Sequence, residues 1–318
     1  MEYATLGRTG LRVSKLGFGA SPLGNEFGEA DPAEGERAVH CAIDLGINYF
    51  DVAPYYGRTL AETRLGAALE GRRDKVVLAT KCGRYDVDGF DFSAARIRLS
   101  IDESLQRLRT DYLDVFLAHD IEFADARQVV EEAIPTMREL QQEGKARFIG
   151  ITGLQLNMLR RVAERIGAEA APVDAILSYC RYNLLITDMD DLLTPFVQRH
   201  GIGLINASPL HMGLLTAGGP PSWHPATAEV KEMGRRLVQF CWQLGIRASD
   251  LALQFCLQHP DVATTLAGMS TVEHVRQNVA AATGSVDAAL IVEVRTLISP
   301  FANRIWPTGR PENQDYAS

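Results

Sequence analysis

Short apolar runs alternate with longer stretches of helical periodicity along most of the chain. The apolar runs are typical of short buried strands and occur at residues 16–20, 49–51, 76–80, 112–117, 148–152, 175–178, 203–207 and 264–267. The helical patterns occur at residues 32–45, 93–108, 126–143, 155–166, 188–200, 226–244, 248–258, 271–282 and 287–298. Strands that alternate with helices predict a parallel sheet, and eight such units predict an α/β protein with a (β/α)8 TIM barrel.

Both ends of the chain carry segments beyond these eight units. Residues 1–15 place the turn residues Gly7 to Gly10 between apolar alternations, which is typical of a β-hairpin. We expect this hairpin to close the bottom of the barrel, and the extra C-terminal helices to lie outside it or over its top. No change in composition marks a boundary, so we expect residues 1–318 to form one domain.

Composition excludes several classes of function. The formal charge of −8 argues against a nucleic-acid or anionic-membrane partner. The amino terminus lacks the pattern of a signal peptide, and no apolar run approaches the roughly 20 residues that span a bilayer. The five cysteines are scattered and form no CxxC motif, which favours reduced thiols and a cytoplasmic protein.

Four residues with complementary chemistry lie at or just after strand ends. Asp51 ends the second apolar run and Tyr56 lies in the turn that follows it. Lys81 follows the third run, and His119 follows the fourth. Because the carboxyl ends of the strands of such a barrel meet on one face, we expect these four side chains to lie together.

The chemistry of this set suits proton transfer to or from an oxygen. A tyrosine titrates near ~10, and a nearby ammonium lowers that pKa. We therefore expect Lys81 to lower the pKa of Tyr56, and Asp51 to orient Lys81. His119 is expected to donate a hydrogen bond to the reacting oxygen. Tyr56 then acts as the general base in alcohol oxidation and as the general acid in carbonyl reduction.

Other motifs support their usual chemistry less well. Gly17-Phe18-Gly19 begins like a dinucleotide-binding GxGxxG motif, but Pro22 takes the place of the third glycine. The acidic stretch from Asp86 to Gly89 lacks the spacing and the final glutamate of a calcium loop. No other histidine makes a spaced motif with His119, so we expect no metal site.

Longer segments resemble the aldo-keto reductases over residues 6 to about 307, and within them the L-galactose dehydrogenase group of aldose 1-dehydrogenases. These segments are Gly17-Phe18-Gly19-Ala20-Ser21-Pro22-Leu23-Gly24, Lys81-Cys82-Gly83-Arg84-Tyr85, Gly89-Phe90-Asp91-Phe92-Ser93, His119-Asp120-Ile121-Glu122-Phe123, Gly150-Ile151-Thr152-Gly153-Leu154, Ala207-Ser208-Pro209-Leu210 and Trp223-His224-Pro225. The resemblance implies that the four residues above are a catalytic tetrad. It selects Tyr56 over Tyr55, because the catalytic hydroxyl directly precedes a glycine.

The resemblance also implies a nicotinamide dinucleotide bound without a Rossmann fold. The expected cofactor-binding residues are Gly19, Ala20, Ser21, Thr152, Ser178, Ser208, Leu210, Met212, Gly213, Leu214, Gly268, Ser270, His274, Gln277 and Asn278. Thr152-Gly153 replaces the family's Ser-Asn pair, and Ala207 replaces the aromatic residue that usually stacks on the nicotinamide. We expect Tyr179 to cover that ring instead. Gly268 and His274 replace the lysine and arginine that hold a 2′-phosphate, which favours NAD over NADP, although Arg276 lies near.

By the same resemblance, the reaction is the NAD-dependent oxidation of an aldose at C1 to an aldono-lactone. L-galactose is the expected substrate, with L-fucose or another D-threo-aldose, or pyridoxal, as alternatives. A general NADPH-dependent aldehyde reductase and a regulatory subunit with little turnover are alternative functions. The substrate candidates are Tyr55, Arg84, Tyr85, Asp120, Glu122 and Trp306, whereas we expect Trp223 to close the core. We expect a monomer or small homo-oligomer.

Overall fold

Eight parallel strands close into a barrel in the computed structural model, which describes residues 1–285 and 287–315. The strands are β3 (Leu16–Gly19), β4 (Tyr49–Asp51), β5 (Val77–Cys82), β6 (Leu113–Ala118), β7 (Ala146–Gly153), β8 (Ala175–Tyr179), β9 (Gly203–Ala207) and β10 (Val262–Gly268). They follow one another in chain order around the barrel, and β10 pairs with β3 to close it. The predicted (β/α)8 barrel is confirmed.

Side chains alternate along each strand between the interior of the barrel and the layer of helices. Val115 and Leu117 of β6 and Ala175 and Leu177 of β8 belong to the apolar cluster inside the barrel. The same alternation turns Tyr179, at the end of β8, inward. The parity of a strand residue therefore decides whether its side chain faces the mouth of the barrel.

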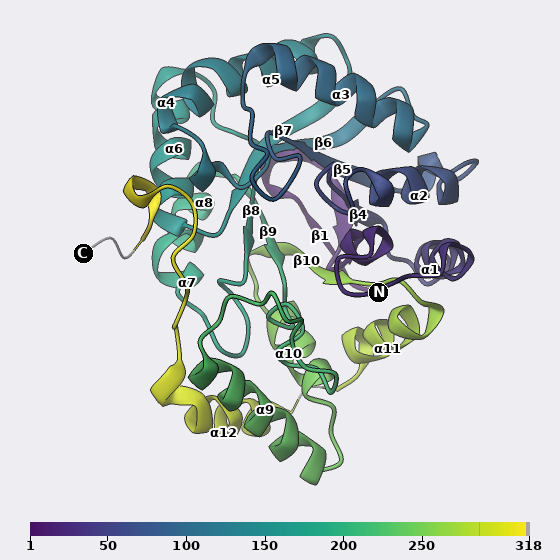
Figure 1. Ribbon diagram of the computed structural model, residues 1–318, viewed down its shortest axis with the longest axis vertical. Coiled ribbons are helices and arrows are strands. Elements are labelled where there is room, and N and C mark those ends of the chain that lie inside the picture. The colour runs from purple at the N-terminus through teal and green to yellow at the C-terminus, as the bar shows by residue number, and fades with distance from the viewer. Residues whose placement is uncertain (286, 316–318) are drawn as a thin grey trace.

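Twelve helices are present in the part of the chain that the structure describes, and most of them surround the barrel (Figure 1). They are α1 (Pro32–Asp44), α2 (Leu60–Ala68), α3 (Ala94–Leu108), α4 (Ala126–Gln128), α5 (Ile134–Gln142), α6 (Leu156–Glu169), α7 (Met189–Leu192), α8 (Thr194–His200), α9 (Ala228–Gln243), α10 (Ala248–Leu257), α11 (Val272–Thr283) and α12 (Ala288–Ile298). A π-helical turn, Val129–Ala133, joins α4 to α5. Helices α9 and α12 pack against each other outside the ring.

Helix α2 is not among the predicted helices. It has only nine residues, and leucines at positions 60 and 65 are its only large apolar side chains. A segment this short and this rich in alanine shows little periodicity, so the pattern gives no signal. Ser93 is the N-cap of α3, because its Oγ accepts a hydrogen bond from the backbone N–H of Arg96.

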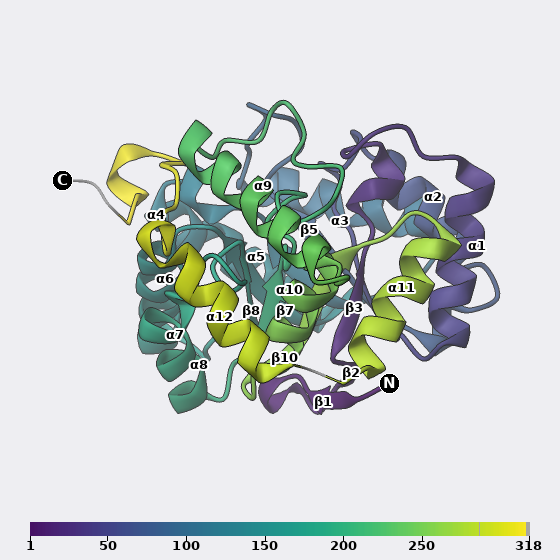
Figure 2. The same ribbon diagram turned by 90° about the horizontal axis from the view of Figure 1, so that it is seen from below.

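The N-terminal hairpin closes the bottom of the barrel, as expected. Its strands are β1 (Tyr3–Thr5) and β2 (Arg12–Ser14). Leu6, Leu11 and Val13 are buried within the apolar cluster inside the barrel. Figure 2 shows the hairpin at one end of the barrel, and the loop that precedes α9 at the other end.

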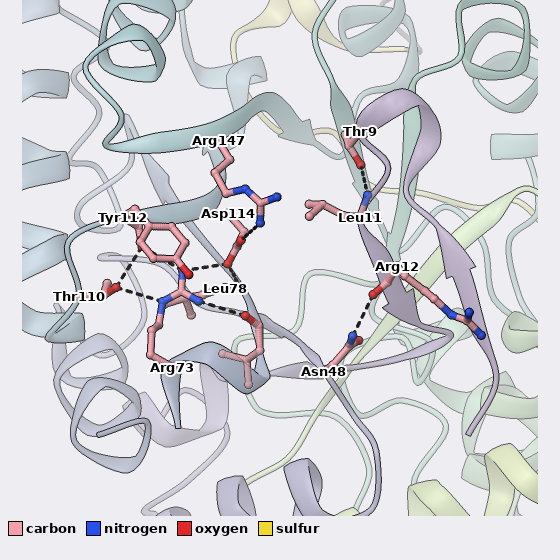
Figure 3. Close-up of polar contacts among 11 residues, drawn as sticks. Thr9, Leu11, Arg12, Asn48, Arg73, Leu78, Thr110, Tyr112, Asp114 and Arg147 are labelled. Carbon is pink, nitrogen blue, oxygen red and sulfur yellow. Dashed lines mark hydrogen bonds and ion pairs between the residues drawn. The ribbon is translucent and has the colours of Figure 1, made fainter. Parts of the chain in front are cut away.

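A polar network joins the strands near this closed end. The carboxylate of Asp114, 2% exposed, accepts hydrogen bonds from the backbone N–H of Leu78 at 2.9 Å, from Arg73 at 2.8 Å and from Arg147 at 2.7 Å. Figure 3 shows this carboxylate between the two arginines. In barrels of this type the end opposite the loops that follow the strands contributes stability rather than chemistry.

Residues 299–315, which we call the C-terminal strap, run from α12 along the barrel to α6 (Figure 1). The carboxylate of Asp315 accepts hydrogen bonds from the backbone N–H groups of Leu156 and Asn157 at 2.9 Å and pairs with the buried Arg181 at 2.9 Å. The backbone N–H of Arg310 donates to the carbonyl of Glu122. The strap therefore fixes several of the loops that follow the strands.

No helix is long and apolar enough to cross a membrane in the residues that the structure describes.

Candidate active site

Asp51, Tyr56 and Lys81 meet at the end of the barrel opposite the hairpin. Lys81, 1% exposed, forms an ion pair with Asp51 and donates a hydrogen bond to the carbonyl of Val52 at 2.9 Å. Its Nζ lies 3.3 Å from the phenolic oxygen of Tyr56. Burial disfavours the ammonium, but Asp51 and Tyr56 together raise the pKa of Lys81 above its usual value. Lys81 therefore remains a cation.

The turn after β4 holds Tyr56 in place through its neighbour Gly57. Gly57 has a positive φ of 60°, and a side chain there would overlap the carbonyl of Gly24. Its backbone N–H donates to the carboxylate of Glu26 at 2.7 Å. Glycine is therefore required after Tyr56, which gives a local reason for the Tyr-Gly pattern.

His119 completes the predicted group of four. Its ring lies 5.8 Å from the ring of Tyr56, nearly perpendicular to it at 86°. The backbone N–H of His119 donates to the carbonyl of Cys82 at 2.8 Å, which ties the end of β6 to β5. Burial, together with the cations of Lys81 and Arg84, holds the pKa of His119 well below its usual value. The imidazole is therefore neutral and can donate a hydrogen bond from one nitrogen.

The expected lowering of the pKa of Tyr56 is not what the structure gives. Burial raises the pKa of Tyr56 to about 12 and outweighs the opposing effect of Lys81. Asp51 raises it as well. Burial of the phenol is therefore the main reason, and the carboxylate paired with the ammonium cancels part of the effect of Lys81.

Arg84 and Asp120 form a second ion pair beside the four residues. Asp120 is 3% exposed and has a left-handed backbone with φ 51°. Its Oδ2 lies 3.7 Å from Nε2 of His119. The guanidinium of Arg84 lies 3.8 Å above the ring of Tyr55. Asp120 and Tyr55 thus lie beside the imidazole, and Arg84 contacts both of them.

Glu122 fills the space that the absent side chain of Gly153 leaves. A side chain at Gly153 would overlap Oε2 of Glu122, which has no hydrogen-bond partner, while Oε1 accepts from the backbone N–H of Leu154 at 2.9 Å. Burial, with Asp120 nearby, raises the pKa of Glu122 to about 8. This carboxyl group therefore carries a proton at neutral pH.

Other predicted residues lie apart from this group. The ring of Tyr85 packs under the guanidinium of Arg96 of α3, at 4.0 Å. Trp306 lies in the strap, 5.6 Å from the rings of both His211 and His224. Trp223 does not close the core, because it is 51% exposed and contacts only the ring of Phe27 among the aromatic contacts of the described chain.

The expected cofactor-binding residues lie at the carboxyl ends of the strands, or in the loops and the helix that follow them. Ser178 is turned toward the helices by the alternation of β8, whereas Tyr179 faces inward and pairs with Ala207 of β9. The side chain of Thr152 faces the interior at the end of β7, and Gly19 and Gly268 are paired at the ends of β3 and β10. Tyr179 therefore occupies the neighbourhood from which the expected aromatic residue is missing.

The loop after β9 has the strained backbone that is common at ligand clamps. Ser208, His211 and Met212 have positive φ angles, as does Gly213. Nε2 of the buried His211 has no hydrogen-bond partner. The loops after the seventh and eighth strands of such barrels, together with a nearby helix N-terminus, often bind phosphate groups. The residues present fit a nicotinamide dinucleotide.

Three further groups near the site escaped the sequence analysis. Phe90 and Phe123 stack at 4.3 Å beside Arg84. Glu34 of α1 accepts a hydrogen bond from the backbone N–H of Val272, the first residue of α11, at 2.8 Å. The two phenylalanines lie in segments that carry the family resemblance, but no spacing marks them, and nothing in the sequence links positions 34 and 272.

Comparisons with known proteins agree with this architecture. The model of the Aldo/keto reductase family matches residues 15–297. The chain is 47% identical over 320 residues to L-galactose dehydrogenase from Arabidopsis thaliana, covering 98% of this chain and 99% of that protein. It is 29% identical to D-threo-aldose 1-dehydrogenase from Pseudomonas sp, covering 92% and 97% of the two chains.

A solved structure gives the same result. The aldo-keto reductase AKR11C1 from Bacillus halodurans, in its holo form, superimposes with a TM-score of 0.78 at 30% identity, covering 96% of this chain and 98% of that one. Family, relatives and fold agree, so the chain belongs to the aldo/keto reductase family and is an oxidoreductase.

Proposed function

We propose that the protein oxidises an aldose at C1 with NAD⁺ and releases the aldono-lactone, with L-galactose as its substrate. The observation that carries this proposal is the contact of Lys81 with both Tyr56 and Asp51, beside His119. The 47% identity to L-galactose dehydrogenase over nearly the whole chain favours this sugar.

Each residue of the tetrad has a separate task in this proposal. Tyr56 takes the proton of the anomeric hydroxyl as the general base. Tyr56 accepts this proton as the phenolate. Lys81 stabilises that phenolate, and Asp51 holds Lys81 in position. The neutral imidazole of His119 donates a hydrogen bond to the reacting oxygen. When bound, NAD⁺ supplies the hydride acceptor.

The charges near α11 support NAD over NADP. Gly268 and His274 replace the lysine and arginine that would hold a 2′-phosphate. Arg276 lines a cavity of about 400 Å³ between α1 and α11, together with Asp44 and with Arg37, whose guanidinium is already paired with Glu34. The carboxylate of Glu34 accepts a hydrogen bond from the backbone N–H of Val272, the first residue of α11, and so places a negative charge there.

Two alternative substrates keep the same chemistry. Oxidation of L-fucose or another D-threo-aldose agrees with the relative from Pseudomonas sp, and oxidation of pyridoxal agrees with the 29% identity to pyridoxal 4-dehydrogenase from Microbacterium luteolum. NADPH-dependent reduction of simple aldehydes is the remaining alternative. We place the protein in the cytoplasm, because all five cysteines are free, as a monomer or small homo-oligomer.

A substrate panel with the Tyr56→Phe variant tests this function. Purified protein is mixed with NAD⁺ or NADP⁺ and with L-galactose, L-fucose, D-arabinose or pyridoxal, and the absorbance of the reduced cofactor is followed. We expect the highest kcat/KM with L-galactose and NAD⁺, and a loss of about 10²- to 10⁴-fold in Tyr56→Phe. Tyr112→Phe, at the closed end of the barrel, is the matched control. Equal turnover by Tyr56→Phe and wild type refutes the proposed role of Tyr56.

A further inference from the structure

The Arg84–Asp120 ion pair lies directly beside the imidazole of His119. The two side chains are 16% and 4% exposed, so the ion pair is largely removed from water. Oδ2 of Asp120 both pairs with Arg84 and lies 3.7 Å from Nε2 of His119. When the reacting oxygen of a substrate contacts His119, the carbon next to the reacting carbon therefore lies close to this ion pair.

Aromatic rings surround the guanidinium of Arg84. It lies 3.8 Å from the ring centre of Tyr55, 5.4 Å from that of Phe90 and 5.6 Å from that of Phe123. The guanidinium is therefore a charged, planar hydrogen-bond donor surrounded by apolar side chains. Ligand sites commonly combine such walls with a few fixed polar groups that set orientation.

The pair keeps hydrogen-bonding capacity that the described part of the protein does not use. The Nε–H of Arg84 is buried and has no acceptor. The carboxylate of Asp120 has lone pairs beyond those that Arg84 occupies. The guanidinium offers donors and the carboxylate offers an acceptor, so a hydroxyl group, which accepts one hydrogen bond and donates another, can bond to both members of the pair.

We propose that the Arg84–Asp120 pair binds the hydroxyl on the carbon next to the reacting carbon, so that the enzyme requires a 2-hydroxylated aldose. This inference rests on the proposed oxidation at C1. Arg84 donates to the C2 oxygen, and the C2 hydroxyl donates to Asp120. When a substrate lacks that hydroxyl, Arg84 and Asp120 lose its hydrogen bonds in a site closed to water. The cost of unpaired buried polar groups is the reason that polar sites reject such analogues.

The test compares L-galactose with its 2-deoxy counterpart. We expect the wild-type kcat/KM to fall by about 100-fold or more on the deoxy sugar, because a site built to bind a hydroxyl rejects the analogue that lacks it strongly. Asp120→Asn and Arg84→Lys should each reduce this discrimination at least tenfold. Arg73→Lys is the matched control, because Arg73 also pairs with a buried aspartate, but at the closed end of the barrel.

Each result decides between the possible roles. Equal kcat/KM values for the two sugars in the wild type overturn the inference and leave the proposed function intact. If the wild type oxidises neither sugar, the proposed function falls, and the inference falls with it. If the two variants lower kcat/KM for both sugars by the same factor, the pair only positions His119 and does not bind the hydroxyl.

Discussion

Nζ of Lys81 lies 3.3 Å from the phenolic oxygen of Tyr56, close enough for one hydrogen bond to couple the two side chains. The same ammonium lies 4.9 Å from the centre of the tyrosine ring. Burial raises the pKa of Tyr56 to about 12, and Lys81 is the main group that opposes this rise. The lysine therefore lowers the pH at which the phenol loses its proton, although burial sets the larger part of the pKa.

Lys81→Met should move the pH profile of oxidation to higher pH. Removing the cation removes its lowering effect, so the pKa of Tyr56 rises further and less phenolate forms at any given pH. We expect kcat for aldose oxidation to fall at least about 100-fold at pH 8. The rising limb of the plot of kcat against pH, measured between pH 6 and 11, should move to higher pH.

The lone carboxylate that Lys81→Met leaves in the core makes a second variant necessary. Asp51→Asn combined with Lys81→Met removes both charges and keeps the volume of both side chains. Because Asp51 itself raises the pKa of Tyr56, the double variant is compared with Asp51→Asn alone. An equal rising limb in these two folded variants would contradict the proposed role of Lys81.

Glu122→Gln should remove part of the pH dependence of stability. The folded pKa of Glu122 is raised to about 8 by burial and by Asp120, so the folded state holds this proton more tightly than the unfolded state does. Its contribution is fully present below the unfolded pKa and is lost as pH rises through about 8. The slope is at most about 1.4 kcal/mol per pH unit.

Urea unfolding at pH 5, 6.5 and 8 checks this prediction. The free energy of unfolding of Glu122→Gln, relative to wild type, should rise with pH. Glu29→Gln, at an exposed position, is the control and should show no such trend. A constant difference across the three pH values would argue against a protonated Glu122.

Asp114→Asn should lower stability and leave the chemistry unchanged. The carboxylate holds Arg73 and Arg147 at the closed end of the barrel, and Arg73 is largely buried. We expect a loss of about 2–4 kcal/mol in the free energy of unfolding, because a buried ion pair loses one partner. Asp102→Asn, which breaks an exposed pair with Lys145, should cost less than about 1 kcal/mol. A large fall in kcat for folded Asp114→Asn would disprove the separation of the two ends.

Glu34→Gln should improve the affinity for NADP⁺ relative to NAD⁺. The carboxylate accepts hydrogen bonds from Val272 and from Arg37, and the hydrogen bond from Val272 is the main cause that lowers its pKa, so it is charged. A like charge near a 2′-phosphate repels it, so we expect the ratio of the two dissociation constants to change by roughly several-fold. Titrating intrinsic fluorescence measures both constants, with Glu36→Gln, at an exposed position two residues further along α1, as the control. No change in the ratio would remove Glu34 from this role.

The sequence predicts the barrel well because its signals are local. The strands 49–51 and 203–207 end where expected, since apolar runs stop at a charged or polar residue there. The position of the tetrad follows from the same rule, because residues at strand ends share one face. Helix α2 escapes prediction, since its short, alanine-rich segment carries no period.

What the sequence does not reveal depends on contacts between distant residues. Arg84 and Asp120 are 36 positions apart, and no spacing rule pairs them. The inward direction of Tyr179 requires the exact start of β8, because a shift of one residue exchanges it with Ser178. The pKa of Tyr56 depends on burial and on the pairing of Lys81, which only the folded structure supplies.

The strap has a consequence for the order in which the chain folds during synthesis. Asp315 caps the first turn of α6, yet it lies 159 positions after Leu156. The ribosome must add all of those residues before the cap exists, so α6 and the loops tied to the strap reach their final form long after the strands beneath them. A nascent chain stalled short of this aspartate would carry a closed barrel whose loops around the candidate active site are not yet fixed.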